Sequence, residues 1–251
     1  MKKVLLKNLI QTAVAVGLLL LTWLIAYLCV GNPLLIPAPW ESGREFGVLL
    51  FSGGFWRGFF STVLRVILAF GISFVLAVVF AVIAYLYPTF NGIFTPVVSA
   101  MRSLPVLAIV LILLSVLGAG ATPIAVAFLS LFPMLYTGVL AALSGIDKHL
   151  IEVSRVYGAS RFGRIWRVYL PLSSPYVLRE AGGALSFALK LVVSAEVVAV
   201  TARSLGGMMQ EARVYAEIPQ LFALVMLVFV VGLILELAVT ALAVKMEKRC
   251  A

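Results

Sequence analysis

The stretch that decides the fold is Glu152–Pro171, EVSRVYGASRFGRIWRVYLP, which is the longest interruption in an otherwise apolar sequence. Its pattern predicts two short amphipathic helices that meet at Gly158, because glycine suits the left-handed residue that ends a helix. We expect Asp147 to cap the first helix and Ser160 to cap the second, which runs to Leu170. A basic helical hairpin between apolar segments is well shaped to contact a soluble partner.

The composition places the chain in a membrane. Of its 251 residues, 63% are hydrophobic and 12% are charged, and the mean hydropathy is +1.16. A soluble domain is about 45–50% apolar and about 25% charged, so this chain lacks the polar residues to cover itself in water. Helices are expected throughout, because isolated strands exposed to lipid would leave backbone groups unpaired. The two cysteines, Cys29 and Cys250, give no metal or disulfide spacing.

Six apolar segments approach the roughly 20 residues that a helix needs to cross a bilayer. The predicted spans are 9–30, 59–86, 95–117, 122–143, 177–200 and 219–244. The N-terminus starts like a signal peptide, but its apolar run is longer than the roughly 7–15 residues of a cleaved signal core. We therefore expect residues 1–251 to form a single all-α transmembrane domain, a six-span helical bundle with a cytoplasmic hairpin in the loop 144–176.

The distribution of Lys and Arg predicts the orientation of these spans. With a cytoplasmic N-terminus, twelve of the 19 basic residues lie in inside segments, four lie outside and three lie within spans. Cytoplasmic loops carry the excess of Lys and Arg, so both termini and the hairpin are expected in the cytoplasm. This bias explains the net charge of +9 without nucleic acid as a partner. The external segment 31–57 is predicted to carry a short interfacial helix around Trp40 to Leu50.

The spacing in the hairpin resembles the EAA loop in the permease subunits of binding-protein-dependent ABC importers. That family pattern is Glu-Ala-Ala, three residues, Gly, nine residues, Ile, one residue, Leu-Pro. This chain keeps the glutamate at Glu152, the glycine at Gly158 and the final Leu-Pro pair with every spacing unchanged, while valine and serine replace the alanines and Val168 replaces the isoleucine. The resemblance implies docking onto a separate ATPase, and the residues it assigns to this contact are Glu152, Ser154, Gly158, Ala159, Ser160, Leu170 and Pro171.

Charged residues are also predicted inside the spans, where charge is expensive and marks functional candidates. Arg65 and Glu236 fit either snorkelling or an ion pair within the bundle. Arg102 and Glu196 fit either such an ion pair or a substrate pathway. Pro105, three residues after Arg102, removes a backbone donor and predicts a kinked or broken helix, which is tolerated where it lines a cavity.

These positions extend the resemblance to the nitrate, sulfonate and taurine subgroup of the same permeases. Many of its members carry Arg-x-x-Pro near the start of the third span, and a glutamate in the fifth span followed by Gly-Leu-Gly. Here the corresponding stretches are 102–105 and 196–207, with Leu-Gly-Gly at 205–207, and Leu-Gly-Ala-Gly at 117–120 stands in for Phe-Gly-x-Gly. The likeness covers about residues 60–240. The pathway residues that it implies are Arg102, Pro105, Glu196 and Gly206.

The resemblance implies a non-catalytic permease subunit of the bacterial inner membrane. Its implied partners are two copies of an ABC ATPase, a second copy of itself and an extracytoplasmic solute-binding protein. The sequence has no G-x-x-x-x-G-K-[ST] loop and no metal-ligand cluster, so we expect no cofactor here and expect ATP and Mg²⁺ on the ATPase. The implied substrate is a small anion such as a sulfonate or nitrate. The alternatives are a vitamin precursor of the pyrimidine or riboflavin type and, less favoured, an ion-coupled secondary transporter or an intramembrane enzyme.

Overall fold

The structure is a computed structural model that describes residues 2–147, 149, 152, 154, 156, 160–164 and 169–250. This part of the chain contains helices and no strand, which confirms the expected all-α fold there. The helices are α1 (Lys2–Val30), α2 (Pro39–Leu50), α3 (Gly53–Leu86), α4 (Pro88–Ser103), α5 (Val106–Ser144), α7 (Arg161–Arg164), α8 (Leu170–Ala199), α9 (Leu205–Val214) and α10 (Ile218–Cys250).

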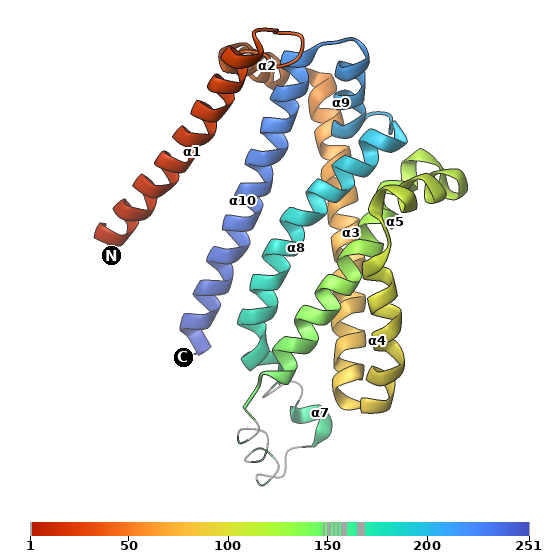
Figure 1. Ribbon diagram of the computed structural model, residues 1–251. Helices are drawn as coiled ribbons and strands as arrows, with labels where there is room; N and C mark the ends of the chain where they lie inside the picture. The colour runs from red at the N-terminus through yellow and green to blue at the C-terminus, as the bar shows by residue number, and fades with distance from the viewer. Residues whose placement is uncertain are drawn as a thin grey trace.

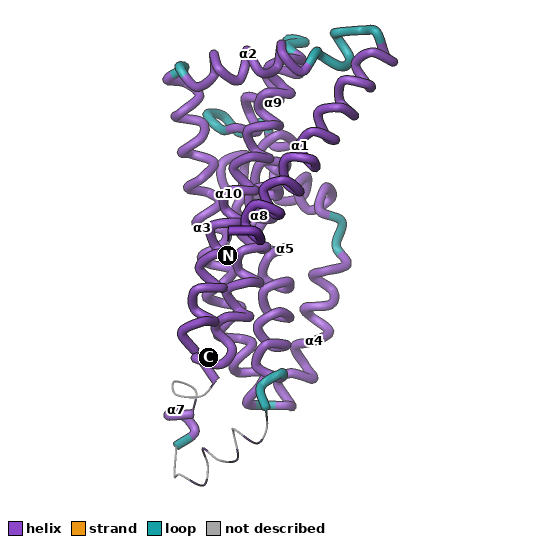
Figure 2. Tube along the Cα trace, turned by 90° about the vertical axis from the view of Figure 1, so that its left-hand side faces the viewer, coloured by secondary structure: helices purple, strands orange, loops and turns teal. Residues whose placement is uncertain are grey.

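The long helices α3, α5, α8 and α10 form one bundle (Figure 1). Helices α2 and α9 lie at one end of this bundle and α7 lies at the other, and a view from the side shows the same division (Figure 2). Among the described residues, four helical stretches are long and apolar enough to cross a membrane, namely α3, α5, α8 and Ile218–Val239 within α10. In the most apolar window of α8, 61% of the residues are buried, against 28% in the other three, so α8 is the central helix.

Small side chains let these helices approach closely. The buried face of α3 repeats every three or four residues, as expected for a helix that packs along one stripe. Its buried members are Phe55, Gly58, Thr62, Val66, Ala69, Ser73, Ala77, Ala81 and Ala84. Lipid is as apolar as the side chains, so association within a bilayer depends on such close packing rather than on the hydrophobic effect.

Helix α2 confirms that a short helix lies within the segment 31–57. Helix α2 occupies Pro39–Leu50, where an interfacial helix is expected. Helix α1 stands apart from the bundle over most of its length (Figure 1). Near its C-terminal end, Trp23 stacks on Phe222 of α10 with ring centroids 5.5 Å apart, and its indole N–H donates to the Pro37 carbonyl at 3.1 Å. The segment that follows α1 is therefore anchored to the bundle.

The predicted third span, 95–117, is divided between two helices. Helix α4 ends at Ser103, the next two residues are extended, and α5 begins at Val106. The physical reason is Pro105, which lacks an N–H and disfavours helical geometry at the preceding residue. Helix α4 starts where α3 ends and contains 16 residues against 34 in α3. At 1.5 Å per residue, α4 is about 24 Å long and α3 is about 51 Å long. The break at the end of α4 therefore lies near the middle of the bundle.

Helix α5 contains the connection that was expected between the third and fourth spans. The helix bends at Gly118, whose φ of 71° and ψ of 172° are not helical. Such a backbone conformation is accessible to glycine and strained for other residues. The remainder of α5 includes the predicted fourth span, 122–143, so Gly118 separates two helical stretches where the connection between the third and fourth spans is expected.

The two caps predicted for the hairpin are present. Asp147 Oδ1 accepts a hydrogen bond from the His149 N–H at 2.9 Å, and Ser160 Oγ accepts one from the Gly163 N–H at 3.0 Å. The predicted hinge at Gly158 lies outside the described residues.

The prediction that a helix ends at Leu170, before Pro171, is wrong. Leu170 instead begins α8, and Pro171 lies in its first turn, so this helix starts earlier than the predicted span 177–200. Proline is favoured there because the first N–H groups of a helix have no intrahelical partner and its fixed φ is already helical. In this position Pro171 starts a helix, whereas the sequence pattern was interpreted as ending one.

Candidate functional site: a buried carboxylate between three helices

A fully buried carboxylate lies at the end of α8 nearest α9. The Glu196 side chain is not exposed to solvent, although its charge makes burial expensive. Its Oε1 accepts from Arg65 Nη1 at 2.9 Å, which makes a salt bridge with α3. The Thr62 hydroxyl lies 2.9 Å from Oε2, and the Gly206 N–H donates to Oε2 at 3.1 Å. These partners are what make a buried carboxylate tolerable.

Thr62 connects the carboxylate to a second backbone group of α9. Its hydroxyl donates to Glu196 and accepts a hydrogen bond from the Leu205 N–H at 2.9 Å. Leu205 and Gly206 are the first residues of α9, and the first N–H groups of a helix have no partner within it. The N-terminus of a helix also favours negative charge. We call Thr62, Arg65, Glu196 and these two N–H groups the Glu196 cluster, and it joins α3, α8 and α9.

Two glycines allow α9 to reach this position. A Cβ on Gly206 would collide with the Glu196 side chain and would lie 2.6 Å from both the Val193 carbonyl oxygen and the Val197 nitrogen. Across the interface, a Cβ on Gly58 of α3 would lie 3.2 Å from Met208 Sδ. Close approach therefore requires glycine at 206, whereas a larger residue at 58 would need a small shift of Met208.

The backbone is strained on both sides of α9. Among the described residues, the non-glycine residues with positive φ are Val200, Arg203 and Ala216, at 51°, 51° and 56°. Two of them precede α9 and one follows it. A left-handed conformation costs about 1–2 kcal/mol for a residue with a side chain, and more for a β-branched residue such as Val200. The Glu196 cluster therefore holds a short helix whose two connections are both strained.

The same segment is bonded to the bend in α5. The Thr201 hydroxyl donates to the carbonyl oxygen of Ala119 at 2.9 Å, one residue after the bend at Gly118. The next turn is closed by Ser204, which caps α9 by accepting from the Gly207 N–H at 2.8 Å. Two glycine-containing stretches singled out in the sequence, 117–120 and 205–207, thus lie around one junction.

The structure brings together only part of the predicted pathway set. Glu196 and Gly206 are in direct contact through the hydrogen bond described above. Arg102 is exposed in the last turn of α4, and Pro105 is exposed at the break before α5. The cation paired with Glu196 is Arg65, which confirms the ion-pair interpretation of that arginine and rejects a pairing of Arg102 with Glu196.

The described part of the predicted coupling set lies at the end of the bundle that carries α7. Glu152 is exposed, with its carboxylate 3.9 Å from His149 Nδ1, and Ser154 is half-buried. Ser160 precedes α7, and the Leu-Pro pair starts α8. Gly158 and Ala159 lie outside the described residues. Among the described residues, no three His, Cys, Asp or Glu side chains form a group that could hold a metal ion.

Thr62 was missed by the sequence analysis, although a signal for it exists. It lies three residues before Arg65, and residues three apart in a helix occupy one face. A hydroxyl on the same buried face as a charged residue can donate a hydrogen bond to the counter-ion of that charge. Threonine is common in apolar helices, however, so this spacing carries weight only once the partner carboxylate is known.

Comparison with known proteins identifies a family. The family described as "Binding-protein-dependent transport system inner membrane component" matches residues 73–248. The taurine transport system permease protein TauC of Escherichia coli K12 is 26% identical over 242 residues, which cover 92% of this chain and 88% of that protein. A probable ABC transporter permease protein of Brucella melitensis is 27% identical, with 91% of each protein covered.

Solved structures share the fold. A bacterial ABC transporter involved in the import of the acidic polysaccharide alginate has a chain with a TM-score of 0.66 and 18% identity, which covers 96% of this chain and 98% of its own length. The MetNI methionine ABC transporter in an inward-facing conformation has a chain with a TM-score of 0.64 and 21% identity, which covers 76% of this chain and 94% of its own length.

Proposed function

The chain belongs to the family of binding-protein-dependent transport system inner membrane components, and from this premise we propose that it forms the substrate pathway of an ATP-driven importer for a small anion. Its relatives are ABC transporter permeases, so the chain is a multi-pass inner-membrane component without catalytic activity of its own. ATP and Mg²⁺ then bind to a partner ATPase. The match over most of the chain is the observation that carries this proposal.

We place the end of the bundle that carries α7 in the cytoplasm. Both termini point toward this end (Figure 1), and twelve of 19 basic residues belong to segments assigned to it. This orientation follows the positive-inside rule. In this arrangement the chain crosses the membrane six times, and the third crossing is the interrupted one made by α4 and the first part of α5.

The loop 147–171 is proposed to dock onto the ATPase. Support comes from its spacing, from its place at one end of the bundle, and from its direct continuation into α8, the central helix. A displacement of the loop would be passed to α8, whose first residues, Leu170 and Pro171, belong to the loop. Two copies of the chain with two ATPases would then rock between inward-facing and outward-facing states as ATP binds and is hydrolysed.

The break at 103–106 is proposed to line the pathway between two copies. An arginine exposed near the middle of a membrane-spanning bundle is too expensive to face lipid, and an interrupted helix leaves backbone groups without partners. Both features are tolerated where they face a second protein surface or a water-filled cavity. Arg102 in this place would attract an anionic substrate.

The Glu196 cluster is proposed to hold α3, α8 and α9 together at the outer end of the pathway. Both carboxylate oxygens of Glu196 accept hydrogen bonds from other members of the cluster. Glu196 is therefore better suited to hold α9 than to carry protons. This argues against an ion-coupled carrier that relays protons through Glu196. Transport by the importer instead requires the outer ends of α3, α8 and α9 to move as one unit.

The substrate class is the finer part of the proposal. A sulfonate fits because a relative over 92% of the chain is a taurine transport permease, and because Arg102 is a cation at the proposed pathway. In such importers the external binding protein would select the ligand, so the binding protein that copurifies with the chain is the reagent for a ligand screen.

The test is a Gly158→Val variant in the reconstituted complex of chain, ATPase and binding protein. The sequence predicts a left-handed residue at Gly158, where a valine would cost about 1–2 kcal/mol and misalign the docking surface. We expect ATP hydrolysis to persist while transport of the bound anion falls strongly. Normal transport per ATP by this variant would refute the coupling role of the loop.

A further inference from the structure

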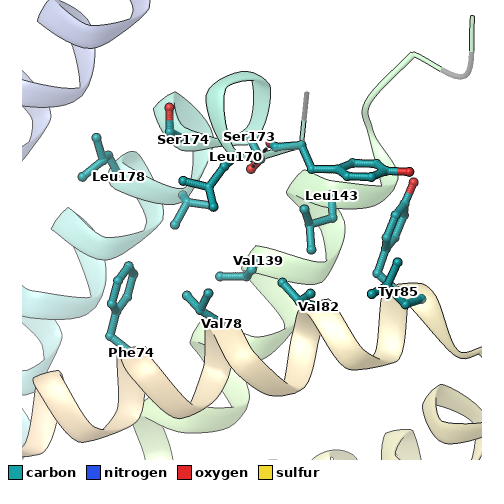
Figure 3. A pocket seen from close by; sticks show the side chains of 13 residues that line it. Phe74, Val78, Val82, Tyr85, Val139, Leu143, Leu170, Ser173, Ser174 and Leu178 are labelled. Carbon is teal, nitrogen blue, oxygen red and sulfur yellow. Dashed lines mark hydrogen bonds between the residues drawn. The ribbon is translucent and has the colours of Figure 1, made fainter. Parts of the chain in front are cut away.

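An apolar groove of about 340 Å³ lies between α3, α5 and the beginning of α8. Figure 3 shows that Phe74, Val78 and Val82 project from one face of α3 toward the other two helices. Leu143 of α5 and Leu170 of α8 close the groove from the opposite side. The groove lies at the end of the bundle that carries α7.

The length of the groove matches one leaflet of a bilayer. Along α3 its lining runs from Phe74 to Leu86, so the wall is about 18 Å long at 1.5 Å per residue. The hydrocarbon core of a bilayer is about 30 Å thick, so one leaflet contributes about 15 Å. An extended acyl chain that enters at one end therefore fits along the whole groove.

The chemistry of the wall also fits an acyl chain. None of the residues that line the groove is charged. The two serines in the wall use their hydroxyls internally, since Ser173 donates to the Tyr169 carbonyl at 2.7 Å and Ser174 donates to the Pro171 carbonyl at 3.0 Å. A polar solute would find few free partners along this wall, whereas a hydrocarbon chain needs none.

The end of the groove nearest α7 has the features of a membrane interface. Tyr85 and Tyr169 line this end, and their rings pack edge to face with centroids 5.3 Å apart. Tyrosines are enriched at the headgroup level of membrane proteins. Helix α7 lies at the same end of the bundle and contains two arginines and no acidic residue, so this end attracts negative charge.

We propose that this groove binds one acyl chain of an anionic phospholipid, whose headgroup lies at the end of the bundle that carries α7. The proposal rests on the proposed function only for naming this end as the inner leaflet. An acyl chain in the groove fills the space between α3, α5 and the first turns of α8. It therefore fixes the spacing of α8, whose first two residues belong to the loop 147–171.

The test uses the full chain with its ATPase in nanodiscs that contain phosphatidylglycerol with a photoreactive acyl chain. After irradiation, the labelled peptides are mapped by mass spectrometry. We expect labelling to concentrate on 74–86 and 169–178. It should exceed the labelling by a phosphatidylcholine analogue by roughly fivefold for each basic residue that the headgroup engages.

Matched variants separate the groove from the rest of the lipid-facing surface. Val78→Phe places a bulky ring in the groove, and Val79→Phe places the same ring one residue away on the exposed side of α3. We expect loss of the labelling at 74–86 and 169–178 in the first variant and no change in the second. Val82→Phe repeats the test should Val78→Phe fail to fold.

Three results would overturn the proposal. The first is labelling spread evenly over all lipid-facing helices, and the second is equal labelling by the phosphatidylcholine analogue. The third is crosslinking of the groove to a second copy of the chain, which would make the groove a protein interface. Copurification of the ATPase is recorded on the same samples, so failure of the importer assignment would be seen separately.

Discussion

The substitution Glu196→Gln tests whether the Glu196 cluster holds α9 in place. It keeps the size of the side chain but replaces one carboxylate oxygen by an NH₂ group, which cannot accept a hydrogen bond. The two oxygens now accept from Arg65 on one side and from Gly206 on the other, so one of these donors must face another donor in the variant. Two groups of α9 depend on this carboxylate, namely the Gly206 N–H directly and the Leu205 N–H through Thr62.

The magnitude follows from these two attachments. Hydrogen bonds to charged groups contribute about 1.5–3 kcal/mol each, and a lost buried partner adds its desolvation penalty. We therefore expect the free energy of opening α9 to fall by about 3 kcal/mol, which corresponds to roughly a hundredfold larger open population. The strained connections at Val200 and Ala216 favour opening once the cluster is weakened.

The assay is thiol labelling of a cysteine placed at Ala212, a residue of α9 that is 1% exposed. The two native cysteines, Cys29 and Cys250, are first replaced by serine. When opening and closing are faster than labelling, the labelling rate reports the open population, so it should rise about a hundredfold in Glu196→Gln. Glu217→Gln is the control, because this exposed carboxylate follows α9 outside the cluster. Equal labelling rates in the two variants would refute the holding role of Glu196.

Three further substitutions test the same geometry. Gly206→Ala should cost several kcal/mol because its Cβ would lie 2.6 Å from backbone atoms, whereas Gly183→Ala has open space and should leave the yield of folded protein unchanged. Thr201→Val removes the hydrogen bond to Ala119 and should lower stability by about 1 kcal/mol, seen as a lower melting temperature in detergent. Arg102→Gln should leave the melting temperature unchanged but reduce anion transport, and unchanged transport would remove Arg102 from the pathway.

The sequence identified the charged residues within the membrane spans, but it did not identify which of them form an ion pair. Arg65 and Glu196 were both recognisable because charged residues are rare in apolar helices. Their pairing was not predictable, because they lie 131 residues apart in the chain and Arg102 was an equally plausible cation. Helix periodicity shows which face a residue occupies, but only the packed bundle shows which faces meet.

Proline was the residue whose effect depended most on position. Pro105 was expected to kink or break a helix, and it separates α4 from α5. Pro171 was expected to follow the end of a helix, yet it lies in the first turn of α8. The missing N–H is costly inside a helix and costs nothing in the first turn, so the outcome depends on where the helix begins. A single sequence does not determine that boundary.

The most direct test of the importer assignment is affinity purification of the tagged chain from its native membrane in a mild detergent, with the copurifying proteins identified and counted. The account predicts an ABC ATPase at one copy per permease chain, with a solute-binding protein recovered after crosslinking. Recovery of the chain without any ATPase, even after crosslinking, would contradict it.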